Sequence, residues 1–143
     1  MVVSSWVYVS AKNIMTADGK EKINSFRQLY AWQESHKLTL LIYETTKEFP
    51  KEEIFGLTSQ IRRSASSVGA NLAEGFCRVS LKDKAHFYTI AAGSISETEN
   101  HLELSHDLKY VTTDAYAKLR EQIVSVHKLC NALIKSIKSS PNY

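Results

Sequence analysis

The sequence at residues 56–78 reads GLTSQIRRSASSVGANLAEGFCR, and this stretch decides the fold. Its apolar residues recur every three or four positions, which is the spacing of side chains on one face of an α-helix. These apolar residues are Leu57, Ile61, Ala65, Val68, Leu72 and Phe76. Small residues between Ser64 and Gly69 leave room for a second backbone to come close. We therefore predict a core-facing helix that packs tightly against a neighbour.

Two basic residues in the same stretch, Arg62 and Arg63, have no acidic residue three or four positions away. Ion pairs along one helix form at that spacing. We therefore predict that both guanidinium groups are available to an anionic group elsewhere.

The composition of the chain favours a single all-α domain. A chain of 143 residues can bury a sizeable core without disulfides or metals. Only two prolines and five glycines occur, and the apolar residues follow helical rather than alternating spacing. The net charge of +3 is mild, so any case for nucleic-acid binding depends on where the charge lies.

Cysteine usage and hydropathy indicate a cytoplasmic protein. Cys77 and Cys130 lie far apart and lack metal-ligand spacing, so neither a disulfide framework nor a zinc site is expected. No positive charge precedes the short apolar run Trp6 to Val9, which argues against a signal peptide. No stretch approaches the roughly 20 apolar residues of a membrane span, so we expect no membrane association.

We divide the chain into an N-terminal extension (residues 1–24), a helical domain (25–139) and a short tail (140–143). The valines and aromatic residues between Val2 and Val9 favour extended structure, and residues 17–20 form a turn signal. The extension is therefore expected to be flexible or to dock as a short strand.

Four helices are predicted in the helical domain: three over residues 26–48, 56–78 and 81–108, and a fourth that follows Thr112 or Thr113 and includes Tyr116 to Ile137. Phe49-Pro50 ends the first helix, because the residue before proline disfavours helical geometry. Ser80 and Thr112 or Thr113 are candidate N-caps. The inward residues expected in the first helix are Leu29, Trp32, His36, Leu40 and Tyr43, with Leu38, Leu41 and Ile42 widening the stripe. Those of the third are Phe87, Ile90, Ala91, Ile95, Thr98, Leu102 and Leu108, and those of the fourth are Tyr116, Leu119, Ile123, Val126, Cys130, Leu133 and Ile137.

Short turns between four long helices predict an antiparallel up-down-up-down four-helix bundle. Apolar residues beyond one stripe on the first and fourth helices suggest that copies of the chain associate. The alternative is that these residues thicken the core of a single chain.

Clustered basic residues make nucleic acid a candidate partner, since phosphate contacts need concentrated Lys and Arg. The candidate contacts are Arg62, Arg63, Arg78, Lys82 and Lys84. The fourth helix adds further basic residues, and residues 97–107 of the third helix are acidic. Both faces could equally be solvated, or could pair between subunits.

No catalytic or metal-binding constellation is evident, and no cofactor is expected. Glu103 and His106 have the Glu-x-x-His spacing of di-iron bundles, but the chain lacks the second such pair that a di-iron site needs. The serines of residues 64–67 lack a nucleophile-elbow motif, and no phosphate-binding Gly-rich loop occurs. His36 is expected to be a hydrogen-bonded interior or interface residue rather than a ligand.

Several motifs resemble the four-helix bundle proteins encoded in 23S rRNA intervening sequences. The resemblance spans residues 26 to about 139 and rests on four segments: FRQLYAWQ (26–33), FPKEEIFGLTSQIRR (49–63), ANLAEGF (70–76) and DLKY (107–110). Relatives often carry proline at the position of Gly69, so any bend in the second helix should be softer here.

The resemblance implies a non-enzymatic bundle that assembles into a homopentameric ring. It also implies a relation to the accessory variability proteins of diversity-generating retroelements, which bind nucleic acid and a reverse transcriptase. Arg62 and Arg63 match the family's Arg-Arg pair and are the first choice for phosphate contact with RNA or DNA. The alternative function is a protein-interaction scaffold that does not bind nucleic acid.

Overall fold

The structure, a computed structural model, describes residues 9–10, 13–14 and 23–143. Its main elements are four long helices, α1 (Tyr30–Thr45), α2 (Leu57–Cys77), α3 (Leu81–Asp107) and α4 (Thr113–Lys138). Three 3₁₀ turns flank α1 and precede α2, namely η1 (Phe26–Gln28), η2 (Thr46–Glu48) and η3 (Lys51–Glu53). The predicted all-α class and the four predicted helices are therefore confirmed.

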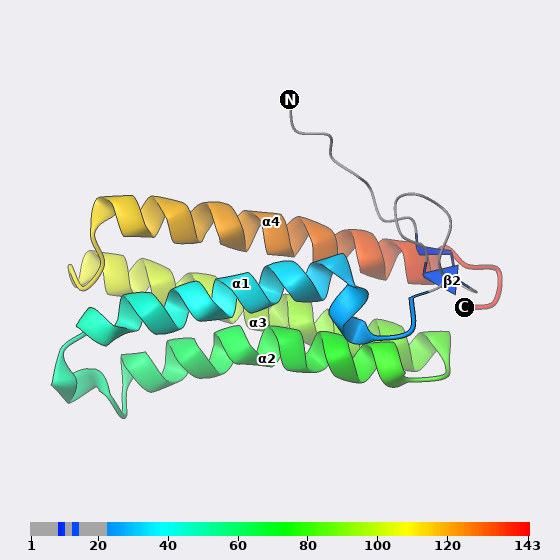
Figure 1. Cartoon of the computed structure of the whole chain (residues 1–143), viewed down its shortest axis with the longest axis horizontal. Helices are drawn as coiled ribbons and strands as arrows, with labels where there is room; N and C mark the ends of the chain where they lie inside the picture. Colours follow the sequence, from blue (N-terminus) through cyan, green and yellow to red (C-terminus); the bar gives the residue numbers. More distant parts are fainter. Residues whose placement is uncertain (1–8, 11–12, 15–22) are drawn as a thin grey trace.

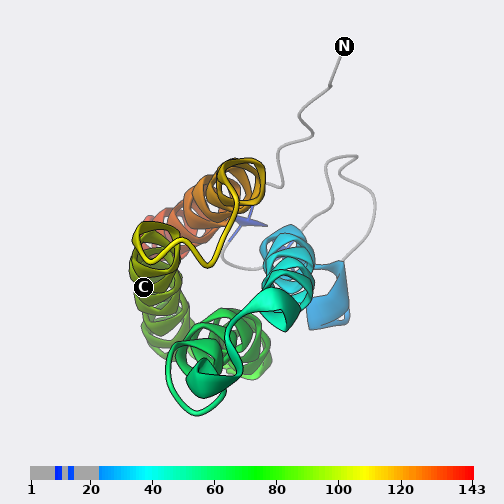
Figure 2. The same ribbon diagram turned by 90° about the vertical axis from the view of Figure 1, so that its left-hand side faces the viewer.

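The helices form an antiparallel bundle in which consecutive helices are neighbours (Figure 1). Seen end-on, α1, α2, α3 and α4 follow one another around the bundle, so that α4 lies beside α1 (Figure 2). One end carries the α1–α2 and α3–α4 connections, and the other carries the α2–α3 connection and the C-terminus (Figure 1).

Local signals in the sequence set the helix ends. Phe49 has extended backbone before Pro50 and ends the first helical segment. The hydroxyls of Ser80 and Thr112 accept hydrogen bonds from Asp83 N and Ala115 N and cap α3 and α4. α3 ends within one residue of its predicted end, but the backbone there was not predicted: Lys109 has φ 62°, a left-handed conformation that glycine usually supplies. The Lys109 and Tyr110 amides then donate to carbonyls in the last turn of α3.

The α2–α3 pair is the most extensive helix contact in the bundle, and small polar side chains line it. Thr98 Oγ1 donates to Ser64 Oγ at 2.9 Å, and Ser94 Oγ donates to Ser67 Oγ at 3.0 Å. We call these four residues the hydroxyl ladder. At the end of α2, a Cβ atom on Gly75 would lie 2.7 Å from the ring of Tyr88, so only glycine fits there. The predicted close approach along α2 is confirmed, and α2 continues through Gly69 as one uninterrupted helix.

The predicted stripes of α2 and α4 are confirmed almost residue for residue, whereas those of α1 and α3 are partly wrong. In α1, His36, Leu40 and Tyr43 are exposed. The buried residues of that helix are Ala31, Glu34, Ser35, Leu38 and Ile42. In α3, Ile90 and Leu108 are exposed, while the buried set includes Ala85, Tyr88, Ser94 and Ser105.

Part of the N-terminal extension is described. Two-residue strands β1 (Val9–Ser10) and β2 (Asn13–Ile14) pair antiparallel, and β1 lies against α4. Residues 1–8, 11–12 and 15–22 lie outside the described residues, and with them most of what was predicted for the extension.

Candidate nucleic-acid interface

The five predicted cations do not form one cluster. Arg62 and Arg63 lie in the second turn of α2, near the end that carries the α1–α2 connection. Arg78 follows the last residue of α2, and Lys82 and Lys84 lie in the first turn of α3. At a rise of about 1.5 Å per residue, the two groups are about 24 Å apart along α2.

Arg62 connects the second helix to the end of the first. Its Nε donates to Thr46 Oγ1 at 2.8 Å, and its guanidinium lies 4.7 Å from the centre of the Tyr43 ring. Within the described residues, no carboxylate lies within ion-pair distance of Arg62. The side chain is half-buried, so only part of the guanidinium faces solvent.

Arg63 contacts an anionic group on another helix, in agreement with the prediction that it was available to one. It forms an ion pair with Glu97 of α3, which lies 34 positions later in the chain. The same Glu97 oxygen is 3.6 Å from His101 Nε2. The Arg63 side chain remains 58% exposed, so the pair contributes at most about 1 kcal/mol to stability.

Two of the three cations at the α2–α3 corner, Arg78 and Lys82, are exposed. Arg78 pairs with Glu74 one turn earlier, and its guanidinium lies 4.7 Å from the centre of the Phe87 ring. Lys82 is exposed and has no ion-pair or hydrogen-bond partner among the described residues. Arg78 and Lys82 therefore present positive charge at the surface of this corner.

The Lys84 side chain binds the C-terminal end of α2. Its ammonium donates to the Phe76 carbonyl at 2.6 Å and to the Gly75 carbonyl at 3.3 Å, which satisfies two carbonyls at the end of α2. Burial lowers the pKa of this half-buried amine. Lys84 is thus the least available of the five predicted cations for contact with a ligand.

The acidic residues of α3 pair within the subunit. Besides the Arg63–Glu97 pair, Arg120 of α4 contacts both Glu99 and Glu103. The Tyr116 hydroxyl donates to Glu103 at 2.7 Å, a bond that raises the pKa of Tyr116. The acidic surface of α3 therefore neutralises arginines on both neighbouring helices.

The two ends of the bundle differ in net charge. The spacing of charged residues along the sequence does not show this difference. Within residues 23–143, the half of the bundle nearer the α2–α3 connection comprises residues 23–37, 68–94 and 126–143 (Figure 1). This half carries eight Lys and Arg residues against three Asp and Glu residues. The opposite half, residues 38–67 and 95–125, carries seven against ten. The α2–α3 half therefore has a net positive charge and the opposite half a net negative charge, mainly because the α2–α3 half has few acidic residues.

Three lysines of α4 belong to that positive end and were not among the predicted contacts. Lys128, Lys135 and Lys138 are exposed and lack partners among the described residues. Their spacing of seven and three residues places them on one face of the helix. The helical spacing was a signal for this group, but only the antiparallel topology shows that it lies at the same end as Lys82.

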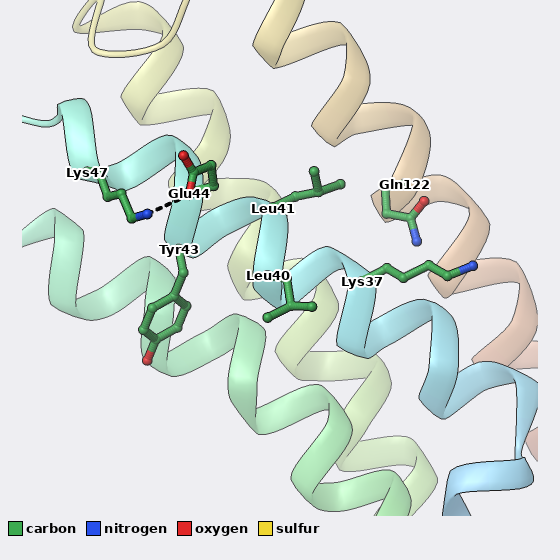
Figure 3. Close-up of a pocket in the computed structure, with 7 residues that line it drawn as sticks. All are labelled: Lys37, Leu40, Leu41, Tyr43, Glu44, Lys47 and Gln122. Carbon is green, nitrogen blue, oxygen red and sulfur yellow. Dashed lines mark hydrogen bonds and ion pairs between the residues drawn. The ribbon is translucent and has the colours of Figure 1, made fainter.

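A second surface feature is an open groove of about 680 Å³ along α1, to which α4 contributes Gln122; we call it the α1–α4 groove. Leu40, Leu41 and Tyr43 supply its apolar part, and Gln122 reaches it from α4 (Figure 3). Lys37, Glu44 and Lys47 carry its charges. His36, predicted to be interior or at an interface, is exposed on the same helix and stacks on Trp32 at 4.8 Å.

Glu103 and His106, the residues with di-iron spacing, are engaged with α4. His106 stacks on Tyr116 at 4.0 Å, and Glu103 accepts the Tyr116 hydrogen bond. Within residues 23–143 and the two short strands, no three acidic, histidine or cysteine side chains are arranged to hold a metal ion.

None of the helices in the part of the chain that the structure describes is both long and apolar enough to cross a bilayer.

Comparisons with known proteins agree on one family. The chain is similar to a solved protein of unknown function from the S23 ribosomal protein family of Bacteroides thetaiotaomicron, with 26% identity and a TM-score of 0.67. That similarity covers 73% of this chain and 95% of the other. No curated protein sequence matches the chain. The sequence profile described as 23S rRNA-intervening sequence protein matches residues 27–132, and the chain belongs to this family.

Proposed function

We propose that this protein is a non-enzymatic, homo-oligomeric bundle that binds RNA or DNA through the α2–α3 end. The observation that carries the proposal is the excess of basic over acidic residues in that half of the bundle. Lys and Arg side chains that neutralise phosphates supply most of the sequence-independent affinity for nucleic acid.

The contacts that we propose combine the predicted corner with the lysines of α4. They are Arg78, Lys82, Lys128, Lys135 and Lys138, all exposed. Arg62 and Arg63, the first choice from the family resemblance, lie in the net acidic half, where Glu97 already pairs with Arg63. They remain candidates, with a smaller expected contribution.

Self-association would multiply this charge. Exposed apolar side chains on α1 and in the α1–α4 groove support association, and the family resemblance supports a pentameric ring. In a closed ring with parallel subunits, the basic ends lie on one side and form a continuous positive surface.

Two charge-matched double variants test which end binds. Lys82→Ala/Lys135→Ala and Arg62→Ala/Arg63→Ala each remove two positive charges. We expect the first to weaken binding to structured RNA and to duplex DNA at least about 10-fold at low salt, and to reduce the slope of log affinity against log salt by about 2. We expect a clearly smaller loss for the second.

Two results would contradict parts of the proposal. A wild-type protein without salt-dependent affinity does not bind nucleic acid. A larger loss in Arg62→Ala/Arg63→Ala places the contact at the other end of the bundle. Thermal unfolding is the control for folding: Lys82→Ala/Lys135→Ala should stay close to wild type because both lysines are exposed, whereas Arg62→Ala/Arg63→Ala also removes the hydrogen bond from Arg62 to Thr46 and should unfold at a slightly lower temperature.

The second candidate function is a protein-interaction scaffold. The observation in its favour is that four of the five predicted cations already have partners within the chain, while the α1–α4 groove is open. A protein partner, such as the reverse transcriptase that the resemblance suggests, would then bind without nucleic acid. Nuclease treatment before co-purification separates the two functions.

A further inference from the structure

The last three turns of α4 carry a polar face whose residues lie on one side of the helix. Lys128, Asn131, Lys135 and Lys138 follow one another at steps of three, four and three residues, which is the spacing of neighbours on one helical face. All four side chains are exposed, although β1 also lies against α4. We call these four residues the α4 polar face.

The chain around the α4 polar face does not neutralise its charge. No ion pair or side-chain hydrogen bond involves these four residues in the part of the chain that the structure describes. Residues 122–143 contain no Asp or Glu. In contrast, the arginines that lie against the acidic part of α3 are paired with its glutamates. The lysines of the α4 polar face are therefore available to an anionic partner, and a polyanion can neutralise several of them at once.

Asn131 adds a neutral hydrogen-bonding group between the lysines. It lies about 4.5 Å along the helix axis from Lys128 and about 6 Å from Lys135. Its side-chain amide offers two donors and one acceptor oxygen, so it can bind an uncharged polar group of a ligand. The α4 polar face therefore matches a ligand that carries phosphates on both sides of neutral polar groups, which is the chemistry of a groove in a nucleic-acid duplex.

The packing of α4 limits how deeply this face can enter a groove. α4 lies between α1 and α3 in the bundle and packs against both (Figure 2). A helix is about 10–12 Å across with its side chains, so only about 5–6 Å of α4 stands clear of its neighbours. The major groove of B-form DNA is about 8.5 Å deep, and Asn131 would not reach the base edges there. The minor groove of A-form RNA is wide and shallow and displays 2′-hydroxyl groups.

We propose that the α4 polar face binds the minor groove of double-stranded RNA. The three lysines contact phosphates on either side of the groove, and Asn131 forms hydrogen bonds with 2′-hydroxyl groups between them. A DNA duplex still meets the lysines but has no 2′-hydroxyl group for Asn131. This inference rests on the nucleic-acid binding proposed above, and it names the kind of nucleic acid and the residue that selects it.

The test compares three ligands by fluorescence anisotropy across a salt series. The ligands are an RNA duplex, a DNA duplex of the same sequence, and one strand of the RNA alone. We expect the wild-type protein to bind the RNA duplex about 5-fold more tightly than the DNA duplex at the same salt, because the DNA complex lacks the hydrogen bond to Asn131. The single strand should bind more weakly than the RNA duplex, since it does not hold phosphates on both sides of Asn131.

Two variants separate selection from charge. Asn131→Ala keeps the net charge, so we expect it to weaken binding to the RNA duplex about 5-fold and to leave DNA binding and the salt dependence unchanged. Lys135→Ala should weaken binding to both duplexes and reduce the slope of log affinity against log salt by about 1.

Asn100→Ala is the matched control for Asn131→Ala. Asn100 is exposed on α3 in the half of the bundle with net negative charge, so this variant should bind all three ligands as the wild type does. The three substituted side chains are exposed, and thermal unfolding that matches wild type shows that the variants fold.

The contrary results distinguish this inference from the proposed function. Equal wild-type affinity for the two duplexes, tighter binding to the single strand, or an Asn131→Ala protein that keeps its preference for RNA overturns the assignment of double-stranded RNA. Salt-dependent binding that Lys135→Ala weakens would still support the proposed function. A wild-type protein without salt-dependent affinity for any of the three ligands overturns both.

Discussion

The α2–α3 and α1–α4 helix pairs differ in how closely they pack. Between α2 and α3, glycine and hydroxyl side chains let the helices lie close, and Tyr88 fills the space beside Gly75. Between α1 and α4, the packing is less extensive and leaves an open groove. A polar contact joins these two helices, in which Gln122 Nε2 donates to both the carboxylate and the backbone carbonyl of Glu34 at 2.9 Å.

This difference in packing suggests that the α2–α3 pair mainly determines the stability of the fold, whereas the α1–α4 pair also provides a surface for binding. Close packing allows no extra volume, so the α2–α3 contact should be sensitive to added atoms. A grooved contact held by a few polar bonds exposes apolar area that a partner can cover. We therefore expect substitutions in the first pair to act mainly on folding, and those in the second to act also on association.

The largest effect is expected from Gly75→Val. The new side chain would overlap the ring of Tyr88, which is fully buried and cannot move away. We expect a loss of about 3 kcal/mol in the free energy of unfolding, measured by chemical denaturation.

Gly93→Val is the matched control for this substitution. Gly93 also lies within a helix, but among the described residues no atom outside its own helical turn lies within 4 Å of its Cβ position. The expected change is below about 0.5 kcal/mol, because valine and glycine differ little in helix propensity. Equal losses at both positions would show that backbone propensity, not packing, explains the glycine at position 75.

An intermediate effect is expected from Gln122→Leu, which removes a hydrogen bond from the nearly buried Glu34 carboxylate. The expected loss is about 2 kcal/mol near neutral pH. Burial by itself raises the pKa of Glu34, but hydrogen bonds from Lys37 and Gln122 outweigh it and hold the pKa below its ordinary value of 4.5.

The ionisation of Glu34 also determines how the stability of the protein changes with pH. A carboxyl with a lowered folded-state pKa contributes stability that is present above its ordinary pKa and is lost as the pH falls below it. In Gln122→Leu the pKa of Glu34 rises, so the acid-dependent loss should be smaller than in wild type. Denaturation curves measured near pH 7 and near pH 4 compare the two proteins. A variant with the full wild-type dependence would show that Gln122 does not set the ionisation of Glu34.

The smallest effect is expected in the hydroxyl ladder, from a double-mutant cycle of Ser64→Ala and Thr98→Val. Their hydrogen bond is buried and couples the two helices directly. We expect a coupling free energy of about 1 kcal/mol, the net worth of one such bond. A coupling near zero would show that the small volume of these side chains matters, and not their hydroxyl groups.

The fold could be predicted where one face of a helix was apolar and the other was not. In α2 and α4 the inward residues followed directly from spacing. In α1 the apolar residues surround much of the helix, so periodicity could not tell the core residues Leu38 and Ile42 from the exposed Leu40 and Tyr43. The error itself was informative, because Leu40 and Tyr43, which were wrongly assigned to the core, line the groove.

The candidate site could be predicted only in part, since charge pairing is a property of the tertiary structure. Glu97 lies 34 positions from Arg63, and no local spacing links them. Lys84 reads as surface charge in the sequence, but it closes the end of α2. The concentration of lysines at one end depends on antiparallel topology, which places the end of α4 next to the start of α3 (Figure 1).

The buried thiol on α4 gives the bundle an internal reporter. Cys130 is fully buried, and burial raises the pKa of its thiol to about 12, whereas Cys77 is exposed. Only a thiolate attacks alkylating reagents readily, so modification of Cys130 requires the helices to separate. With Cys77 blocked first, the rate of Cys130 labelling measures how often the native bundle opens. The same measurement on assembled and dissociated protein would show how strongly association holds the helices together.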